Sequence, residues 1–308
     1  RYPGDFDGVI AGAPAINPRS NVLRMWIAQA VHKDEASYIP ASKYPAIHRA
    51  VLEACDAIDG VKDGVLEDPT RCHFDPKAIL CAGVDGQDCL TSAQVEAARK
   101  MYGPVIKTST QELIFPGFEP GSELGWGFTA GAEPPQRTVD SLRNTVFHSQ
   151  SWNYTDFNFD RDVALLDRET RIMNAMDPNL KPFFSHGGKL LQYHGWSDNL
   201  IPPQNSVNYY MSVLDKMGGV SKVTDSFRLF MVPGMSHCRA GEGTDRFDVI
   251  SALEQWAEKG KAPESILANR YAGEKVDRTR PLCPYPQVAI YNGTGSINDA
   301  ANFACKAR

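Results

Sequence analysis

The sequence has no apolar run near 18 residues, so it predicts no transmembrane helix. Its formal charge of −5 over 308 residues leaves neither a basic excess for nucleic acid nor a polybasic patch for a membrane. We therefore expect neither nucleic acid nor a membrane as a partner, and a small or neutral substrate instead. The 42% hydrophobic and 22% charged residues are typical of a soluble globular protein.

A signal peptide is also missing, so any export signal would lie upstream of the sequence shown. The first residues, RYPGDFDG, resemble the end of a helix followed by a turn and a strand rather than a mature N-terminus. We expect the chain to be a fragment, or one piece of a cleaved precursor.

No C-x-x-C pattern occurs among the seven cysteines, which argues against a zinc ribbon or a thioredoxin-like motif. Local spacing suggests the disulfides Cys55–Cys72, Cys81–Cys89 and Cys283–Cys305, with Cys238 left over. Closing the first loop would stabilise the fold by roughly 3 kcal/mol. Disulfides predict a secreted or periplasmic protein with its signal removed, whereas the alternative is a cytosolic protein with reduced, buried thiols.

The composition and the hydrophobic pattern of the chain change along its length. Residues 5–14 form a short apolar strand, and residues 19–180 are rich in turns, cysteines, aromatics and glycines. Within that stretch we predict helices over Tyr44–Ala54 and Ser92–Tyr102, and an irregular loop over Phe115–Pro135.

From residue 182 onward the pattern is regular. Strands are predicted over Lys189–His194 and Phe227–Val232, each followed by a loop and a helix, over Gln204–Met217 and Phe247–Glu258. Alternating strands and helices predict an α/β fold with parallel strands and right-handed crossovers.

Asp198 and His237 follow these two consecutive strands. The carboxyl ends of parallel strands meet at one edge of a sheet, where catalytic groups gather. A carboxylate that accepts the imidazole Nδ1–H is what a hydrolase triad requires, and the order acid then histidine is that of α/β-hydrolases. The alternative is a helix-capping Asp and a structural His.

The nucleophile is absent, because the chain contains no G-x-S-x-G. The nearest string, GMSHC, lacks the second glycine, and Ser236 is adjacent to the proposed base. It cannot form a nucleophile elbow while His237 acts as its partner, so we reject it.

Three carboxylates at Asp56, Asp59 and Asp63 lie within eight residues, with glycines between them. Like charges this close repel unless they are solvated or bridged by a cation, and Ca²⁺ takes carboxylate and carbonyl oxygens. Residues 59, 61, 63 and 65 would each direct either a side chain or a backbone carbonyl toward the inside of the turn. The alternative is an acidic surface turn.

The strings RYPGDFDGVIAGAPA, CDAIDGVKDGVLEDPTRCHFDP, YHGWSDNLIPP, MVPGMSHC and TRPLCPYPQVAIYNG span nearly the whole chain. In order and spacing the sequence resembles the tannase and feruloyl esterase family, which includes mono-hydroxyethyl terephthalate hydrolases. The resemblance implies an α/β-hydrolase core and matches the catalytic carboxylate and base to Asp198 and His237. It implies a serine in a Cys-Ser elbow just upstream of Arg1, so we expect the fold to be truncated at its N-terminus and inactive by itself.

The resemblance also assigns the three stretches of the chain. Residues 1–18 are a core segment, residues 19–180 an inserted lid with the calcium loop, and residues 181–308 the C-terminal part of the core. The lid shapes the aromatic acyl pocket in the family. Five lid aromatics could line it, although each is expected more as lid core than as a substrate contact: Trp126, Phe128, Trp152, Tyr154 and Phe157.

By the same resemblance Cys238 pairs with the missing cysteine beside the serine, although a free buried thiol stays an alternative. The calcium ligands it implies are Asp56, Asp59, Asp63 and the carbonyls of Val61 and Val65, in a structural rather than catalytic role.

We therefore expect a serine carboxylesterase that hydrolyses esters of aromatic acids such as ferulate or gallate through an acyl-enzyme, with structural Ca²⁺ and no redox cofactor. The possible partners are a small aromatic ester and the missing N-terminal segment. The alternatives are a lipase or peptidase on the same core, and a calcium-stabilised binding module without catalysis.

Overall fold

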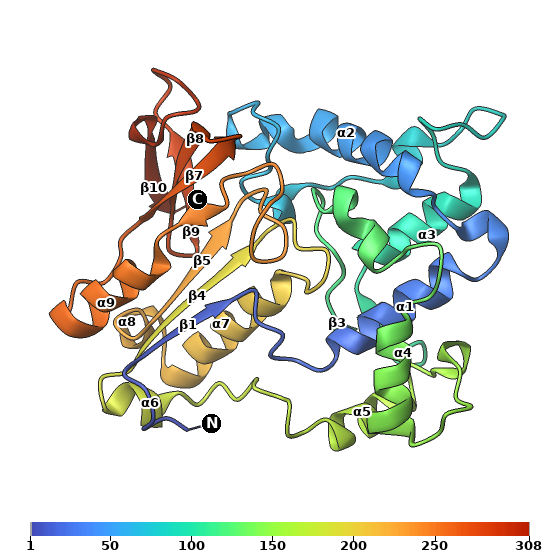
Figure 1. Cartoon of the computed structure of the whole chain (residues 1–308), viewed down its shortest axis with the longest axis horizontal. Helices are drawn as coiled ribbons and strands as arrows, with labels where there is room; N and C mark the ends of the chain where they lie inside the picture. Colours follow the sequence, from blue (N-terminus) through green and yellow to red (C-terminus); the bar gives the residue numbers. More distant parts are fainter. Residues whose placement is uncertain (1, 308) are drawn as a thin grey trace.

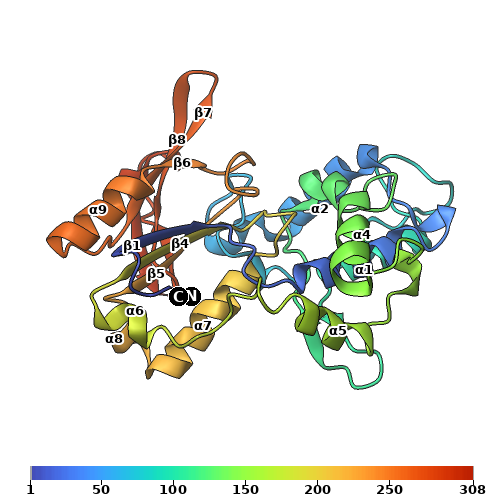
Figure 2. The same ribbon diagram turned by 60° about the horizontal axis from the view of Figure 1, so that its bottom comes forward.

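The computed structural model describes residues 2–307, so Arg1 and Arg308, at the outer ends of the first and last predicted segments, lie outside the described residues. The polypeptide is arranged as two regions side by side (Figure 1). One contains β1, the strands from β4 onward and the helices that flank them, and the other contains the helices between residues 20 and 169 together with the short strands β2 (Val105–Ile106) and β3 (Leu113–Phe115). A turned view shows the same division (Figure 2).

A parallel sheet of three strands lies at the centre of the first region. Its order is β1-β4-β5, with bounds Gly8–Gly12, Lys189–Gly195 and Phe227–Val232. Five of the six residues of β5 are buried, as expected for a parallel strand covered on both faces. Helix α7 (Gln204–Met217) connects β4 to β5 and ends at Gly218, whose φ of 90° provides a left-handed C-terminal cap.

The other helices of this region are α6 (Lys181–Ser185), α8 (Val220–Val223) and α9 (Val249–Lys259). Helix α9 packs against β1 and β4. The sequence predicted its start at Phe247, but Phe247 pairs with β7 in β6 (Arg246–Phe247). The helix starts later because the Asp248 carboxylate accepts the Ser251 N–H as an N-terminal cap.

Antiparallel strands complete the first region, and the sequence analysis did not predict them. Strand β6 pairs with β7 (Ile266–Ala272), β7 with β8 (Lys275–Leu282), and β9 (Gln287–Tyr291) with β10 (Phe303–Ala307). Two of the buried positions of β8 are arginines, Arg278 and Arg280, so the hydrophobic alternation that signals a strand is weak there.

We call residues 13–180 the inserted segment, because they lie between β1 and α6, the helix that precedes β4, the neighbour of β1 in the sheet. Its elements are α1 (Ser20–Val31), α2 (Tyr44–Cys55), α3 (Ser92–Tyr102), β2 (Val105–Ile106), β3 (Leu113–Phe115), the 3₁₀ helix η6 (Glu123–Phe128), α4 (Gln136–Leu142) and α5 (Asp162–Glu169). A hydrophobic cluster of its own holds these elements together.

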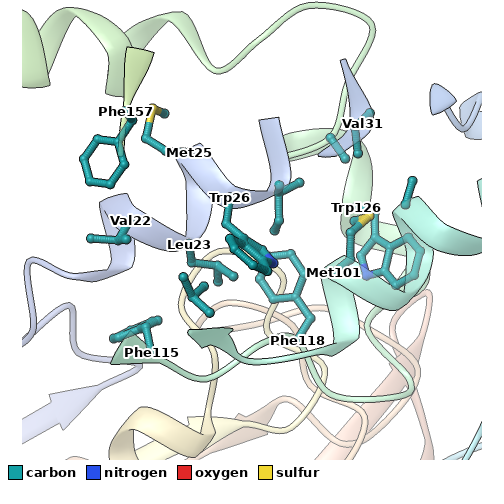
Figure 3. Close-up of a cluster of buried hydrophobic side chains, with 14 of the residues drawn as sticks. Val22, Leu23, Met25, Trp26, Val31, Met101, Phe115, Phe118, Trp126 and Phe157 are labelled. Carbon is teal, nitrogen blue, oxygen red and sulfur yellow. The ribbon is translucent and has the colours of Figure 1, made fainter. Parts of the chain in front are cut away.

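Helix α1 lies at the centre of that cluster (Figure 3). Leu23 and Trp26 point from α1 toward Met101, Phe115 and Phe118 of neighbouring elements. The helix was not predicted, since it is apolar on most of its circumference and therefore shows little of the polar face that marks a surface helix.

The two helices that the sequence predicted here are present. Helix α3 has the predicted bounds, and Thr91 and Gln94 form a reciprocal capping box at its start. Helix α2 extends one residue beyond the predicted end, to Cys55. The stretch Phe115–Pro135 is not irregular throughout, because η6 lies within it.

Three disulfides join the pairs that local spacing suggested, Cys55–Cys72, Cys81–Cys89 and Cys283–Cys305. Within residues 2–307, no helix is both long enough and apolar enough to cross a bilayer.

Candidate active site

Asp198 and His237 meet at the carboxyl edge of the parallel sheet. Asp198 follows β4 and His237 follows β5, its neighbour, and His237 Nδ1 lies 2.7 Å from Asp198 Oδ2. The two loops approach closely at Gly195, where a Cβ atom would lie 2.1 Å from the Met235 carbonyl oxygen. A side chain there would force the loops apart, so this glycine permits the pairing.

Asp198 is fully buried, and four donors surround its carboxylate. Oδ1 accepts the N–H groups of Leu200 and Ile201 at 2.7 and 3.0 Å, while Oδ2 faces His194 and His237. Burial would raise the pKa of Asp198, but the hydrogen bonds from the two histidines outweigh it and lower the pKa to about 2. The carboxylate is therefore ionised and fixed in one orientation.

His194 is a residue of this site that the sequence analysis missed. It is fully buried, and its Nε2 lies 3.0 Å from both Asp198 Oδ2 and the Ile201 carbonyl oxygen. Because both of these are acceptors, Nε2 carries the proton and Nδ1 accepts from the Ser206 hydroxyl at 2.6 Å. This histidine is part of the sequence string YHGWSD. Its contact with the Asp198 carboxylate follows only from its position at the end of β4, which the string alone does not reveal.

His237 has one nitrogen bound and one open. Its side chain is 34% exposed, and among the described residues no hydrogen bond is found for Nε2. The hydrogen bond to Asp198 raises the pKa of His237 against the opposing effects of burial and of the Arg24 charge. Arg24, on α1, is a second residue that the sequence analysis missed, since nothing in the sequence connects α1 to this edge.

Glycines shape the loop that carries His237. Gly234 and Gly241 have φ values of +68° and +97°, and a Cβ on Gly241 would lie 2.1 Å from the Gly234 carbonyl oxygen. Cys238 is an exposed free thiol, and its Sγ lies 3.8 Å from the carbonyl oxygen of Gly12 at the end of β1. The thiol therefore lies beside the chain that enters the inserted segment.

The acidic turn packs against the loop that carries His237, because Pro233 and Gly243 of that loop line the cavity of the turn. Asp59, Val61, Asp63 and Val65 line one cavity of about 20 Å³, together with Glu67. Arg280 forms an ion pair with Asp63, and burial raises the pKa of Glu67 to about 8.

Asp56, predicted as a carboxylate ligand together with Asp59 and Asp63, does not line that cavity. Its two oxygens accept the backbone N–H groups of Asp63 and Gly64, so it organises the turn. Within residues 2–307, the three aspartates do not bring their oxygens within 4.8 Å of one another.

The five aromatics of the inserted segment differ in burial. Trp126 and Phe157 are buried, and Trp152 and Tyr154 pack against the same cluster, as expected for core residues. Phe128 is 78% exposed, so for this residue the core interpretation is wrong. It lies in the last turn of η6, whose buried face is occupied by Glu123 and Trp126.

Chemically, the edge holds an imidazole whose Nδ1–H is held by an ionised, buried carboxylate. This arrangement fixes the tautomer, leaves Nε2 as a base, and stabilises the imidazolium that forms when Nε2 accepts a proton.

Comparison with known proteins gives a consistent family. The family described as tannase and feruloyl esterase matches residues 1–306. An uncharacterized esterase of Xanthomonas campestris pv. campestris is 37% identical over 356 residues, covering 99% of this chain and 62% of that protein. A probable feruloyl esterase B-2 of Aspergillus terreus is 33% identical over 329 residues, with the same coverage. The chain thus spans less than two thirds of the length of these relatives.

Among solved structures, feruloyl esterase B from Aspergillus oryzae superposes with a TM-score of 0.90 at 31% identity, over 99% of this chain and 65% of that one. Together with the parallel strands and flanking helices, this similarity confirms the predicted α/β-hydrolase core. The chain belongs to the tannase and feruloyl esterase family.

Proposed function

We propose that the chain supplies the acid and the base of a serine carboxylesterase. The observation that supports this most is the hydrogen bond between His237 Nδ1 and the buried Asp198 carboxylate, with Nε2 open. The nucleophilic serine would come from protein outside these 308 residues, in keeping with the 62% of the relatives' length that the chain spans.

In this proposal the serine hydroxyl attacks the ester carbonyl while its proton passes to His237 Nε2. The imidazolium, stabilised by Asp198, then protonates the departing alcohol as the tetrahedral intermediate collapses to an acyl-enzyme. Water repeats both steps, with His237 again the base, and releases the acid. Three further donors on Asp198 keep it from rotating away during the cycle.

We assign esters of aromatic acids as substrates, because relatives of this chain are named probable feruloyl esterases. The inserted segment would act as the lid, and its contacts with both catalytic loops support that role. Three disulfides favour a secreted or periplasmic location.

A test uses the full-length protein with methyl ferulate, methyl gallate, p-nitrophenyl alkanoates and a peptide. We expect hydrolysis of the aromatic esters, and a loss of at least 10³-fold in turnover for His237→Ala, about the scale seen when a triad member is removed. Preference for long alkanoates or for the peptide would instead indicate a lipase or a peptidase. Absence of hydrolysis in a folded full-length protein would favour a binding module.

We also infer that the acidic turn binds Ca²⁺ as a structural ion. Asp59 and Asp63 would hold it with Val61 and Val65, because carboxylate and carbonyl oxygens are the donors that this hard cation takes. Arg280 competes for Asp63, and Asp56 would contribute by ordering the turn.

Calorimetric titration of chelated protein with CaCl₂ tests this inference. We expect saturable binding, a lower melting temperature in EDTA, and loss of both effects in Asp59→Asn. A melting temperature that EDTA leaves unchanged, together with no heat of binding, would contradict it.

A further inference from the structure

A second histidine and carboxylate cluster lies where the inserted segment contacts the catalytic loops. His48 of α2 lies between two glutamates: Nδ1 is 2.6 Å from Glu123 Oε2, and Nε2 forms an ion pair with Glu242. Glu123 belongs to η6, and its side chain has no exposed surface. Glu242 belongs to the same loop as His237. The imidazole therefore joins two elements of the inserted segment to the loop of the proposed base.

The chemistry of the cluster requires a charged imidazole. Glu123 also accepts the Tyr102 hydroxyl and the Gly121 N–H through Oε1, each at 2.7 Å. A carboxylate only accepts hydrogen bonds, so a ring that faces two carboxylates must donate from both nitrogens. Burial disfavours the charged ring, but the hydrogen bonds to Glu123 and Glu242 outweigh burial and raise the pKa of His48 to about 9.

Other charged groups lie around the cluster, and two of them favour the ionised form of Glu242. Arg270 of β7 donates to the Glu242 carbonyl oxygen at 2.8 Å, and Arg270 and Arg278 lower the pKa of Glu242 together with His48. Arg49 and Glu53 of α2 line the adjacent cavity of about 480 Å³ with His48. Lys62 and Asp56 line the same cavity, so charges of both signs face the cluster from that side.

The same 3₁₀ helix also contacts the other catalytic loop. Thr129, which follows η6, donates to the Asn199 carbonyl oxygen at 3.1 Å, and the Asn199 amide donates to the Gly125 carbonyl oxygen at 2.5 Å. A Cβ on Gly125 would lie 2.4 Å from Asn199 Cγ, so the approach is close. Asn199 is the residue after Asp198. Thus η6 holds the Asp198 loop directly and the His237 loop through His48.

A small cavity of about 30 Å³ lies among these parts, lined by His48 and Glu242 and by Ser197 and Ser236. These serines immediately precede Asp198 and His237. The cluster therefore shares a cavity with the residues that precede both members of the proposed catalytic pair.

We propose that His48, as a cation shared by Glu123 and Glu242, is a positioning residue that clamps the inserted segment onto the His237 loop and holds that loop in register with Asp198. The structural part of this proposal does not depend on ester hydrolysis; its catalytic consequence rests on the proposed function.

The sign of the pH dependence follows from the charge. A histidine whose pKa is raised on folding contributes stability that is complete below its unfolded pKa, near 6.5, and is lost as pH rises through the folded pKa, about 9. The clamp should therefore hold at neutral pH and open in alkaline solution. Deprotonation removes one of the two donated hydrogen bonds and leaves two carboxylates facing a neutral ring.

The test compares full-length wild type with His48→Gln and Glu242→Gln. His73→Gln is the matched control, because His73 is an exposed histidine of the same inserted segment. Hydrogen exchange followed by mass spectrometry at pH 7 should show amides of residues 233–245 exchanging at least about tenfold faster in both variants, with β5 unchanged. The control should exchange like wild type. Equal protection of this loop in all four proteins would overturn the clamp.

Two further measurements separate a clamp from general destabilisation. The melting-temperature difference between wild type and His48→Gln should be present at pH 7 and vanish as pH rises through about 9, whereas a difference that is independent of pH overturns the charged clamp. Against the best ester, kcat should fall about tenfold in Glu242→Gln, because a small misplacement of a base is costly, while KM changes less than twofold. A change confined to KM would also overturn the positioning role.

The outcomes distinguish the two proposals. A wild-type protein that hydrolyses no ester, but whose loop is released in the variants, contradicts the esterase and supports the clamp. Should His48→Gln fail to fold, Glu242→Gln decides, since its side chain is 46% exposed and its replacement leaves the buried Glu123 paired.

Discussion

His237 and His48 are both held by carboxylates, yet their surroundings differ in one respect. His237 has one nitrogen on Asp198 and an open Nε2. His48 has both nitrogens on carboxylates and a side chain only 9% exposed. A base needs an unoccupied nitrogen and a pKa that lets it lose its proton again, whereas a clamp needs two occupied nitrogens and a charge that persists at neutral pH. The comparison teaches that the second nitrogen, more than the carboxylate, separates the two roles.

The largest expected effect comes from replacing the carboxylate that holds His237. Asp198→Asn in the full-length protein should reduce kcat by about 10⁴-fold, the scale seen when a triad carboxylate becomes an amide and the imidazole tautomer is lost. Steady-state kinetics on the best ester checks this, with Asp225→Asn as an exposed control. A decrease smaller than tenfold would remove Asp198 from the catalytic machinery.

His194 tests whether Asp198 needs its other partner. His194→Gln should destabilise the protein by about 2–4 kcal/mol, since it disturbs the buried Asp198 carboxylate and the Ser206 hydroxyl. Urea unfolding measures the change, and kcat should fall less than in Asp198→Asn. If stability matches that of His73→Gln, His194 is dispensable for the site.

The sequence predicted the Asp198 and His237 pair because both residues follow strongly apolar strands that are consecutive along the chain. Parallel neighbours then bring their ends together by geometry alone. His194 and Arg24 were not predicted, because their roles depend on the direction of a side chain and on the packing of the inserted segment. The periodicity of a sequence gives neither.

The His48 cluster could not be predicted for the same reason. Its members lie on α2, η6 and the His237 loop. Along the sequence, Glu123 is 75 residues from His48 and Glu242 is 194 residues from it. Nothing local in the sequence pairs them. Alternate residues of the acidic turn line one cavity, and the Asp56 carboxylate accepts backbone N–H groups of the turn. The calcium ligands themselves stay a prediction.

Gly125 offers a smaller effect that leaves both histidines intact. Gly125→Ala places a Cβ against the Asn199 side chain and should cost about 1–3 kcal/mol as an overpacked contact. Gly127→Ala is the matched control, since its Cβ would meet Tyr44 at 3.7 Å, an ordinary contact. We expect Gly125→Ala alone to lower the midpoint of urea unfolding and kcat. Equal behaviour of the two variants would mean that η6 does not hold the Asp198 loop.

The smallest expected effect concerns Arg24, whose charge lowers the pKa of His237. Replacing it by glutamine removes a positive charge near the imidazolium, so the pKa of His237 should rise. Because Nε2 is a base only when neutral, the acid limb of kcat/KM should move to higher pH, by about 0.5 for one partly screened charge. Arg168→Gln, an exposed arginine on α5, should leave the limb in place. An acid limb that moves to lower pH, or not at all, would show that Arg24 does not act on His237, and the open nitrogen would then be tuned by Asp198 and burial alone.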